Sequence, residues 1–483
     1  MAGEALRSRP DRPPLTLDDA ATTRLTKRLH AAAKRTGREP TLVSATSRIP
    51  HPGPLTNLLR GAHLTGEPWT LIEQPARDQR GLLALGAAAT LTVDPRHPNR
   101  LRHIAHRWQQ IASTTQADPP DGLPGSGPIL TGGLAFAPGG GHTATWHGYG
   151  DGDFTIPTIA IATHRDNATL TVTLAVHPAD DPDQHLTDAK LATALLVPQP
   201  PEPADPFLAP PAVRSVLAAS HFTEAVARAI HRINDGEFDK IVLARELELR
   251  ATQPWDTAEL LHRLRDRYPG CFIFGVGRSG AAMIGASPEL LLRREGQRAE
   301  TVALAGSTRR SDDPSVDEHL ADQLLNSPKD RHEHQLVVDR IRRTLTPHAL
   351  WVAAADTPQV ATIKNVHHLA TPIRAQLDGR ARLLDLVDAL HPTPAVGGEP
   401  NAAALAAIPE LEGLDRGWYA APIGWTDRTG DGEFFVGLRS AIIRDTHARL
   451  FAGVGIVADS DPATELAETE LKLGAMLSAL RPA

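Results

Sequence analysis

The sequence predicts a mixed α+β protein built on large antiparallel sheets. Two patterns predict this class. From residue 215 onward, short segments with the two-residue alternation of β-strands follow one another at hairpin-like spacing. Amphipathic helices with recognisable capping residues lie between these segments. Before residue 197 the pattern mixes strands with short helices, and we find no internal repeat of fixed period.

The segment DKIVLARELELR, residues 239–250, is the clearest strand. From Glu246 onward it alternates polar and apolar residues, as a strand with one buried face does. Residues 241–244 are apolar throughout, which predicts cover on both faces. Lys240 therefore lies at the mouth of a buried segment. Taken alone, this position is explained if the aliphatic stem of Lys240 lies along apolar surface and its ammonium group is solvated. Further strands are expected at 169–178, 271–276, 281–285, 289–294, 349–354, 433–444 and 448–458.

The helices and loops follow from stripes and end signals. Over 221–234 apolar residues recur at helical spacing, with Ser220 as the expected N-cap and Gly236 as the stop. Residues 1–15 are expected to form a disordered lead-in. The proline-rich segment 197–211 suits either a domain linker or a long surface crossing within one fold. Further helices are expected at 315–326, 328–346, 383–390 and 462–480.

Composition argues against several classes of partner. The net charge is −7 with no long basic run, so we expect neither nucleic acid nor a membrane surface as a partner. No apolar run approaches the ~18 residues of a membrane span, and the N-terminus lacks the apolar region of a signal peptide. Cys271 is the single cysteine and cannot pair within the chain, which favours a reduced, cytoplasmic protein.

Two predicted helices carry carboxylates on faces that should be buried. Glu333 shares a face with Val337 and Ile341. A buried carboxylate is costly unless it is paired or binds a cation, and an ion pair with Arg331 or Arg340 is the structural alternative.

In the last helix Glu465, Glu468 and Lys472 share a second polar face. Acids near a helix N-terminus can simply complement its dipole, and for Glu465 this explanation is strong. Two inward carboxylates from separate helices nevertheless suit Mg²⁺, which prefers oxygen ligands and leaves positions open for substrate oxygens.

Other residues indicate a place for an anion. Glu289 begins an apolar strand, and the turn after residue 305 offers the backbone N–H groups of Gly306 and Ser307. Gly455 lies inside a strand, where glycine is unfavourable unless something approaches the backbone closely. Arg439 lies inside an otherwise apolar strand and would fork a carboxylate. Together these residues suit a small dianionic substrate held through Mg²⁺, with a separate acid and base.

The order of several motifs identifies a resemblance. DKIVLAR, GASPELLLR, LAGSTRR, KDRHEH, HLATPI, HPTPAVGG, GWYAAPIGW and GVGIVADSDPATELAETELKL all lie within 215–480, and GGLAFAP from residue 132 matches more loosely. In this order they resemble the chorismate-utilising enzymes, most of all the isochorismate synthases of menaquinone and siderophore biosynthesis. The resemblance implies one fold over 16–483, with two large antiparallel sheets packed together and helices outside. It also implies chorismate as the substrate, and we expect a monomer.

The resemblance also implies residue roles. Lys240 would be the general base that activates water, and Glu289 the general acid for the leaving hydroxyl. Glu333 and Glu468 would hold Mg²⁺, with Glu465 close by. Burial disfavours the charged form of a lysine and of a glutamate, which suits both roles. The residues expected to contact the substrate are Gly306, Ser307, His368, Ala395, Arg439, Gly455 and Lys472.

Related activities remain as alternatives. Anthranilate synthases usually have glutamine at the position of Lys240, and aminodeoxychorismate synthases a nucleophilic lysine at that of Ala305. Salicylate synthases share the lysine base but typically carry a threonine motif where this chain has Ala395, so the resemblance favours isochorismate synthase. A catalytically silent chorismate-binding protein is the alternative from another class. The chain departs from the common family pattern at Ala421, Val454 and Glu399.

Overall fold

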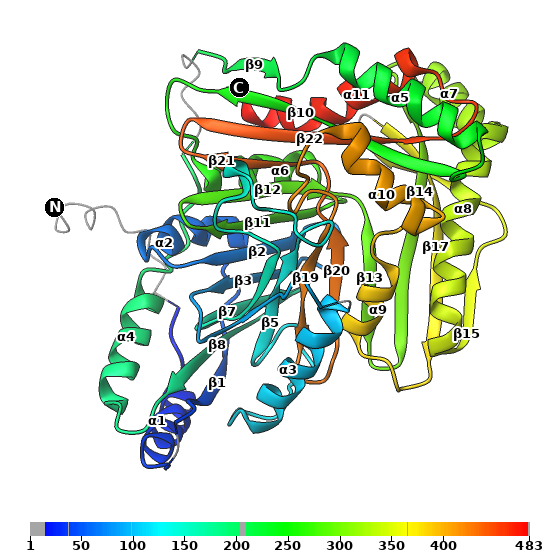
Figure 1. Ribbon diagram of the computed structural model, residues 1–483. Helices are drawn as coiled ribbons and strands as arrows, with labels where there is room; N and C mark the ends of the chain where they lie inside the picture. Colours follow the sequence, from blue (N-terminus) through cyan, green and yellow to red (C-terminus); the bar gives the residue numbers. More distant parts are fainter. Residues whose placement is uncertain (1–14, 37, 98, 203–208, 365, 482–483) are drawn as a thin grey trace.

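The computed structural model describes residues 15–36, 38–97, 99–202, 209–364 and 366–481. Within these ranges the chain forms two antiparallel sheets, one of twelve strands and one of ten (Figure 1). The larger sheet has the order β1 (Thr41–Ile49), β8 (Asn167–Val176), β7 (Ile159–His164), β3 (Arg80–Leu85), β2 (Trp69–Gln74), β11 (Phe272–Arg278), β12 (Ala281–Ser287), β21 (Ser440–Arg444), β22 (His447–Ile456), β10 (Lys240–Arg250) and β18 (Gly398–Glu399), with β9 (Ala212–Ser215) beside β10.

The smaller sheet completes the sandwich. Its order is β15 (Ala349–Ala354), β17 (Val366–Leu377), β14 (Arg298–Arg309), β13 (Leu290–Glu295), β20 (Gly432–Val436), β19 (Pro422–Asp427), β5 (Ile129–Leu134), β6 (Gly152–Ile156) and β4 (Ala89–Thr92), with β16 (Gln359–Ile363) beside β17. The core lies between the sheets, where Phe272 of one stacks on Phe435 of the other with ring centroids 4.9 Å apart. The expected pair of packed antiparallel sheets is confirmed.

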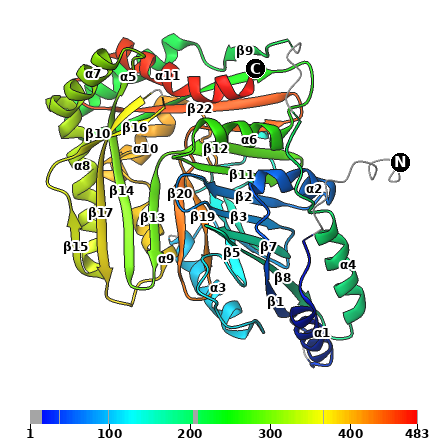
Figure 2. The same cartoon turned by 180° about the vertical axis from the view of Figure 1, so that it is seen from behind.

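Helices lie on the outside of both sheets. Figures 1 and 2 show α5 and α11 over the β10–β22 end of the larger sheet and α8 against β14 and β17 of the smaller one. The helices are α1 (Asp19–Ala33), α2 (Leu59–Leu64), α3 (Arg100–Thr114), α4 (Pro182–Ala194), α5 (Ala219–Asn234), α6 (Thr257–Arg267), α7 (Pro314–Asn326), α8 (Pro328–Leu345), α9 (Leu383–Leu390), α10 (Asn401–Glu412) and α11 (Pro462–Leu480). Short 3₁₀ turns lie at Leu55–Leu58, Ala144–Trp146 and Thr346–His348. In the described ranges no helix combines the length and apolarity that a bilayer crossing needs.

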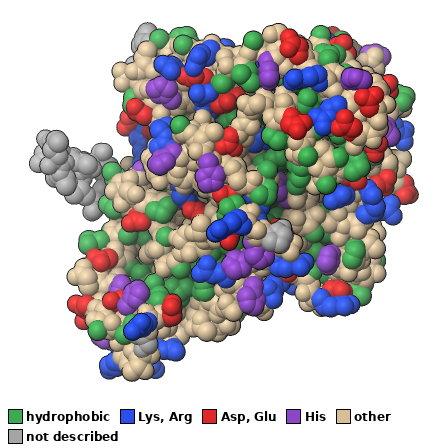
Figure 3. All heavy atoms as spheres, in the orientation of Figure 1, with side chains coloured by type: hydrophobic (Ala, Val, Ile, Leu, Met, Phe, Trp, Pro, Cys, Tyr) green, Lys and Arg blue, Asp and Glu red, His purple; other side chains and the backbone are tan. Residues whose placement is uncertain are grey.

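Strands from both sides of the proline-rich segment 197–211 pair with each other. β2 pairs with β11 in the larger sheet, and β5 pairs with β19 in the smaller one. Acidic and basic side chains are interspersed over the face in Figure 3, in keeping with the absence of a long basic run. The prediction of one folding unit from residue 16 stays a prediction. The disordered lead-in falls outside the described residues except for Leu15, which is buried.

Two local predictions are wrong. The strand expected at 433–444 is two strands, because the chain leaves the smaller sheet after β20 and enters the larger one at β21. Arg439 lies in this crossing with a positive φ of 48°, and not inside a strand. Ser220 lies within α5, whose N-cap is Ala218 without a side-chain capping bond. The other predicted helices and strands are present, with ends shifted by a few residues.

Candidate active site

Two crossings between the sheets lie side by side. One leads from β12 to β13 through Pro288 and Glu289, and the other leads from β20 to β21. They are joined because the Ser287 hydroxyl donates to the carbonyl of Val436 over 2.5 Å and the Val436 amide donates to the carbonyl of Glu289 over 3.0 Å. A cavity opens at this junction. It is lined by ten of the predicted residues, namely Glu289, Gly306, Ser307, Glu333, His368, Ala395, Arg439, Gly455, Glu468 and Lys472.

Lys240 lies beside this cavity at the start of β10 and is fully buried. Its ammonium is 2.8 Å from Oε1 of Glu333 on α8, an ion pair without the alignment of a hydrogen bond. A Cβ atom on Gly455 would lie only 2.4 Å from that Glu333 oxygen and 2.9 Å from Cε of Lys240. The ion pair between Lys240 and Glu333 therefore needs a glycine at position 455. This agrees with the prediction that another group approaches the backbone closely there. Neither Arg331 nor Arg340, the partners considered from sequence, forms an ion pair with Glu333 in the described residues.

Glu289 is an acidic group strongly altered by its surroundings. The residue is 6 % exposed. Burial raises its pKa to about 8, although the ammonium groups of Lys240 and Lys472 act in the opposite direction. A carboxyl group with this pKa is protonated at neutral pH and can donate a proton.

A bulge in β14 shapes the opposite wall. The register with β17 shifts between Ala305 and Ser307, and Gly306 takes a φ of +73° that glycine adopts without strain. The turn aims the Ser307 hydroxyl at Glu468, to which it donates over 2.6 Å. His368 lies opposite Ser307 on β17, and its burial beside Arg439 lowers its pKa to about 3. The imidazole is therefore neutral and can accept a hydrogen bond as well as donate one.

Each predicted metal ligand is paired with a lysine. Glu333 pairs with Lys240, as described above. Glu468 lies 2.7 Å from the Lys472 ammonium, which also donates to the carbonyl of Gly453. Glu465 lies 2.8 Å from the Lys329 ammonium. Burial raises the pKa of Glu465 against the effect of Lys329, whereas for Glu468 the lysine and Ser307 outweigh burial and the pKa is lowered.

The donor set suits a hard cation only in part. Glu333 and Glu468 line the same cavity from separate helices and offer the oxygen ligands that Mg²⁺ prefers. Glu465 does not line the cavity, and no cluster of three metal-ligating side chains is present among the described residues. Two carboxylates plus substrate oxygens are sufficient for Mg²⁺, so these residues fit the ion once they leave their lysine partners.

Sequence reasoning missed two residues of this region. Arg416 lines the cavity and is fully engaged, donating to both oxygens of Glu412 and to the carbonyls of Val242 and Val396. It thereby ties β10 to the turn that carries Ala395. Its spacing of four residues from Glu412 was the available signal. Lys329 is the second missed residue. Its position directly before the acidic Asp330 in KDRHEH was the available signal. His391 does not line this cavity, and its imidazole is hydrogen-bonded to the Phe136 carbonyl.

Comparison with known proteins decides the family. The family model described as "Chorismate binding enzyme" matches residues 27–481. The chain belongs to the chorismate-binding enzymes. This chorismate-binding enzyme is 35% identical over 403 residues to the isochorismate synthase MenF of Bacillus subtilis, an alignment that covers 83% of this chain and 85% of that protein. It is 37% identical over 412 residues to the salicylate biosynthesis isochorismate synthase of Pseudomonas aeruginosa, covering 84% of each.

Solved structures agree with the fold. The menaquinone-specific isochorismate synthase MenF from Escherichia coli superposes on this enzyme with a TM-score of 0.75 at 27% identity, covering 95% of this chain and 99% of that one. The predicted membership of the chorismate-utilising enzymes is confirmed.

Proposed function

We propose that this enzyme is an isochorismate synthase, which converts chorismate to isochorismate with Mg²⁺ as its cofactor. The observation that carries the proposal is the pair formed by Lys240, a buried amine, and Glu289, a carboxyl group with a pKa of about 8, at one cavity. The two relatives named as isochorismate synthases, at 35% and 37% identity, support it. Ala395, where salicylate synthases typically carry a threonine motif, favours release of isochorismate intact.

The reaction exchanges one ring hydroxyl for another. A water oxygen bonds to C2 of chorismate, the ring double bonds shift, and the C4 hydroxyl leaves. Lys240, as a neutral amine, takes one proton from the attacking water. Glu289 gives its proton to the leaving hydroxyl, which departs as a second water, so one water is consumed and one is released. Lys240 can act in this way only after its ion pair with Glu333 opens and the ammonium gives up one proton to solvent.

The remaining side chains bind and orient. Arg439 and Lys472 bring positive charge to the cavity, and Ser307 and His368 bring hydrogen-bonding groups for substrate oxygens. Gly306 and Gly455 leave room for the substrate at the backbone. Glu333 and Glu468 would hold Mg²⁺, with Glu465 behind them. When bound, this ion neutralises and orients a substrate carboxylate.

The test is a time course of purified enzyme with chorismate and Mg²⁺, in which chorismate, isochorismate, salicylate and pyruvate are separated and quantified. We expect isochorismate and chorismate to approach a stable mixture, with ¹⁸O from labelled water at C2 of the product. Lys240→Ala should lower kcat by about 10²–10⁴-fold, the usual contribution of a general base. Lys190→Ala, at an exposed position, is the matched control.

Other outcomes would reject the assignment. Salicylate and pyruvate as main products would make the enzyme a salicylate synthase, and anthranilate formed with ammonium would place it in the nitrogen-using branch. Bound chorismate that is never converted would indicate a silent binding protein.

A further inference from the structure

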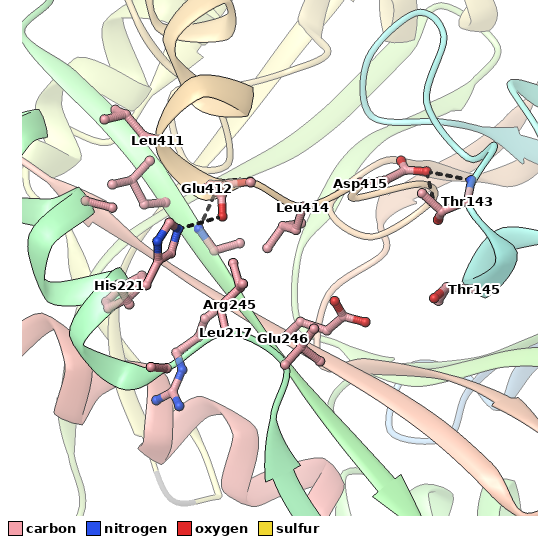
Figure 4. A pocket seen from close by; sticks show the side chains of 17 residues that line it. Thr143, Thr145, Leu217, His221, Arg245, Glu246, Leu411, Glu412, Leu414 and Asp415 are labelled. Carbon is pink, nitrogen blue, oxygen red and sulfur yellow. Dashed lines mark hydrogen bonds between the residues drawn. The ribbon is translucent and has the colours of Figure 1, made fainter.

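A second cavity lies behind the wall of the candidate active site. It is bounded by the start of α5, the middle of β10, the C-terminal end of α10 and the segment around Thr143 and Thr145 (Figure 4). Glu412 lines this cavity, and its ion-pair partner Arg416 lines the active-site cavity. The buried pair therefore separates the two spaces, and nothing in the proposed reaction uses the second one.

One end of the cavity is apolar. Leu217, Leu411 and Leu414 lie around it in Figure 4, and Leu243 and Phe222 also line it. The polar side chain of His221 is labelled among them, and its imidazole is hydrogen-bonded to the Glu412 carbonyl over 3.1 Å. The cavity is partly open, with a volume of about 200 Å³. An apolar cavity of ~150 Å³ is enough to bind benzene. The space therefore suits a ring with a short side chain, and not a folded protein segment.

The floor of the cavity is an open strand edge. Alternate residues of β10 project their backbone groups to this edge: Val242 donates to Gly397, and Glu246 accepts from Val216. Between β18 and β9 no strand of the described residues covers this edge, and the Ala244 amide donates instead to the Glu412 carboxylate over 2.6 Å. The carbonyl of Ala244 faces the same side, and no protein donor is found for it within the described residues. A ligand with an N–H donor would satisfy it.

The polar end of the cavity is acidic. Glu246 and Asp415 lie there, and the side chain of Glu246 is 12 % exposed. Arg449 bonds one oxygen of Glu246, and no partner for the other is found among the described residues. The guanidinium of Arg245 lies away from this end, bonded to Ser215 and Thr469. Burial raises the pKa of Glu246, with Glu248 and Asp415 acting in the same direction and Arg449 against them. The carboxylate is therefore not fully compensated, and a cation beside it would be favoured over an anion.

We propose that this cavity is a second, non-catalytic site that binds a small apolar amine. The ammonium group would lie between the Glu246 carboxylate and the Ala244 carbonyl, and the apolar body would pack among Leu217, Leu411 and Leu414. Chorismate, a dianion, is the wrong charge for it. The site is independent of the proposed activity, since none of its contacts takes part in the reaction.

The probe is 2-phenylethylamine, whose binding to the full-length enzyme is measured by isothermal titration calorimetry. We expect saturable binding of one equivalent, and binding at least tenfold weaker for the neutral 2-phenylethanol and for the anionic 3-phenylpropanoate. Glu246→Gln should weaken amine binding at least tenfold. Glu470→Gln removes the same charge from an exposed side chain on the other side of β10 and should leave binding unchanged.

Saturating chorismate should leave the affinity for the amine unchanged, because Glu412 and Arg416 separate the cavities. Competition between chorismate and the amine would place the amine in the catalytic cavity and overturn the proposal. Equal affinity for the amine and the alcohol, or no saturation by the amine at millimolar concentration, would overturn it as well. The comparison of amine with alcohol needs only the wild-type enzyme, so the test holds even where Glu246→Gln fails to fold.

Discussion

Glu289→Gln should make this enzyme more stable while it destroys activity. The pKa of Glu289 in the folded state is about 8, against 4.5 for a free glutamate, because burial penalises the carboxylate. Between pH 4.5 and pH 8 the Glu289 carboxyl group is ionised in the unfolded chain and protonated in the folded protein. The folded state therefore binds more protons, and stability falls as the pH rises from 4.5 to 8. The amide of glutamine has the same shape as the carboxyl group and does not ionise, so the variant does not lose stability as the pH rises.

The magnitude follows from the pKa difference. The pH of 7 lies 2.5 units above the pKa of this glutamate in the unfolded chain. At ~1.4 kcal/mol per unit, keeping the group protonated lowers the stability of the folded wild-type protein by about 3 kcal/mol. The entropy of unfolding is about 2.1 cal/mol/K per residue, or about 1 kcal/mol/K for 483 residues. Glu289→Gln should then raise the melting temperature by about 3 °C at pH 7 and by nearly nothing at pH 4.5.

The assay is thermal unfolding of wild type and Glu289→Gln at pH 5, 6, 7 and 8, at one scan rate. Glu67→Gln, at an exposed position, is the control and should show no trend with pH. The activity of the wild type should fall as the pH rises through about 8, because the acid then loses its proton. A variant no more stable than wild type at pH 8, or a gain independent of pH, would refute the reasoning.

Two further predictions concern the cation and the backbone. Glu333→Gln and Glu468→Gln each remove one carboxylate from the cavity, so we expect weaker Mg²⁺ binding by calorimetry and lower turnover; full activity of both variants in excess chelator would exclude these residues as ligands. Gly455→Ala would place a Cβ 2.4 Å from Glu333 and should reduce kcat strongly. Gly474→Ala, with open space around its Cβ on α11, should instead stabilise the protein by roughly 0.5–1 kcal/mol, and equal effects of the two changes on kcat would contradict the close-approach argument.

Local patterns predicted the elements well because each is set by nearby residues. The N-cap of α8 at Ser327 and that of α11 at Asp461 are where proline at the next position indicated. The periodicity of β10 and the inward position of Glu333 were also visible in the sequence.

Features that depend on distant pairing were not visible. The apolar run at 433–444 contains a change of sheet at Gly437–Arg439, and periodicity cannot distinguish a crossing from a continuous strand. The partner of Glu333 is Lys240, 93 positions away, whereas sequence reasoning considered only nearby arginines. The motif resemblance placed Lys240 and Glu333 in one site, but it did not show that they form an ion pair.

The charges around the cavity bear on the proposal that an anionic substrate binds together with a cation. Lys240, Lys329, Lys472 and Arg439 face the carboxylates of Asp330, Glu333, Glu465 and Glu468, while Glu289 is uncharged at neutral pH. Under the proposed function, a dianion entering alone would compete for the lysines and leave buried carboxylates without partners, which is costly. A divalent cation that entered with it would restore the balance, since Glu333 and Glu468 would then face the metal in place of their lysines. Such an exchange would separate Lys240 from Glu333, so under this proposal cation binding and access to the base are coupled.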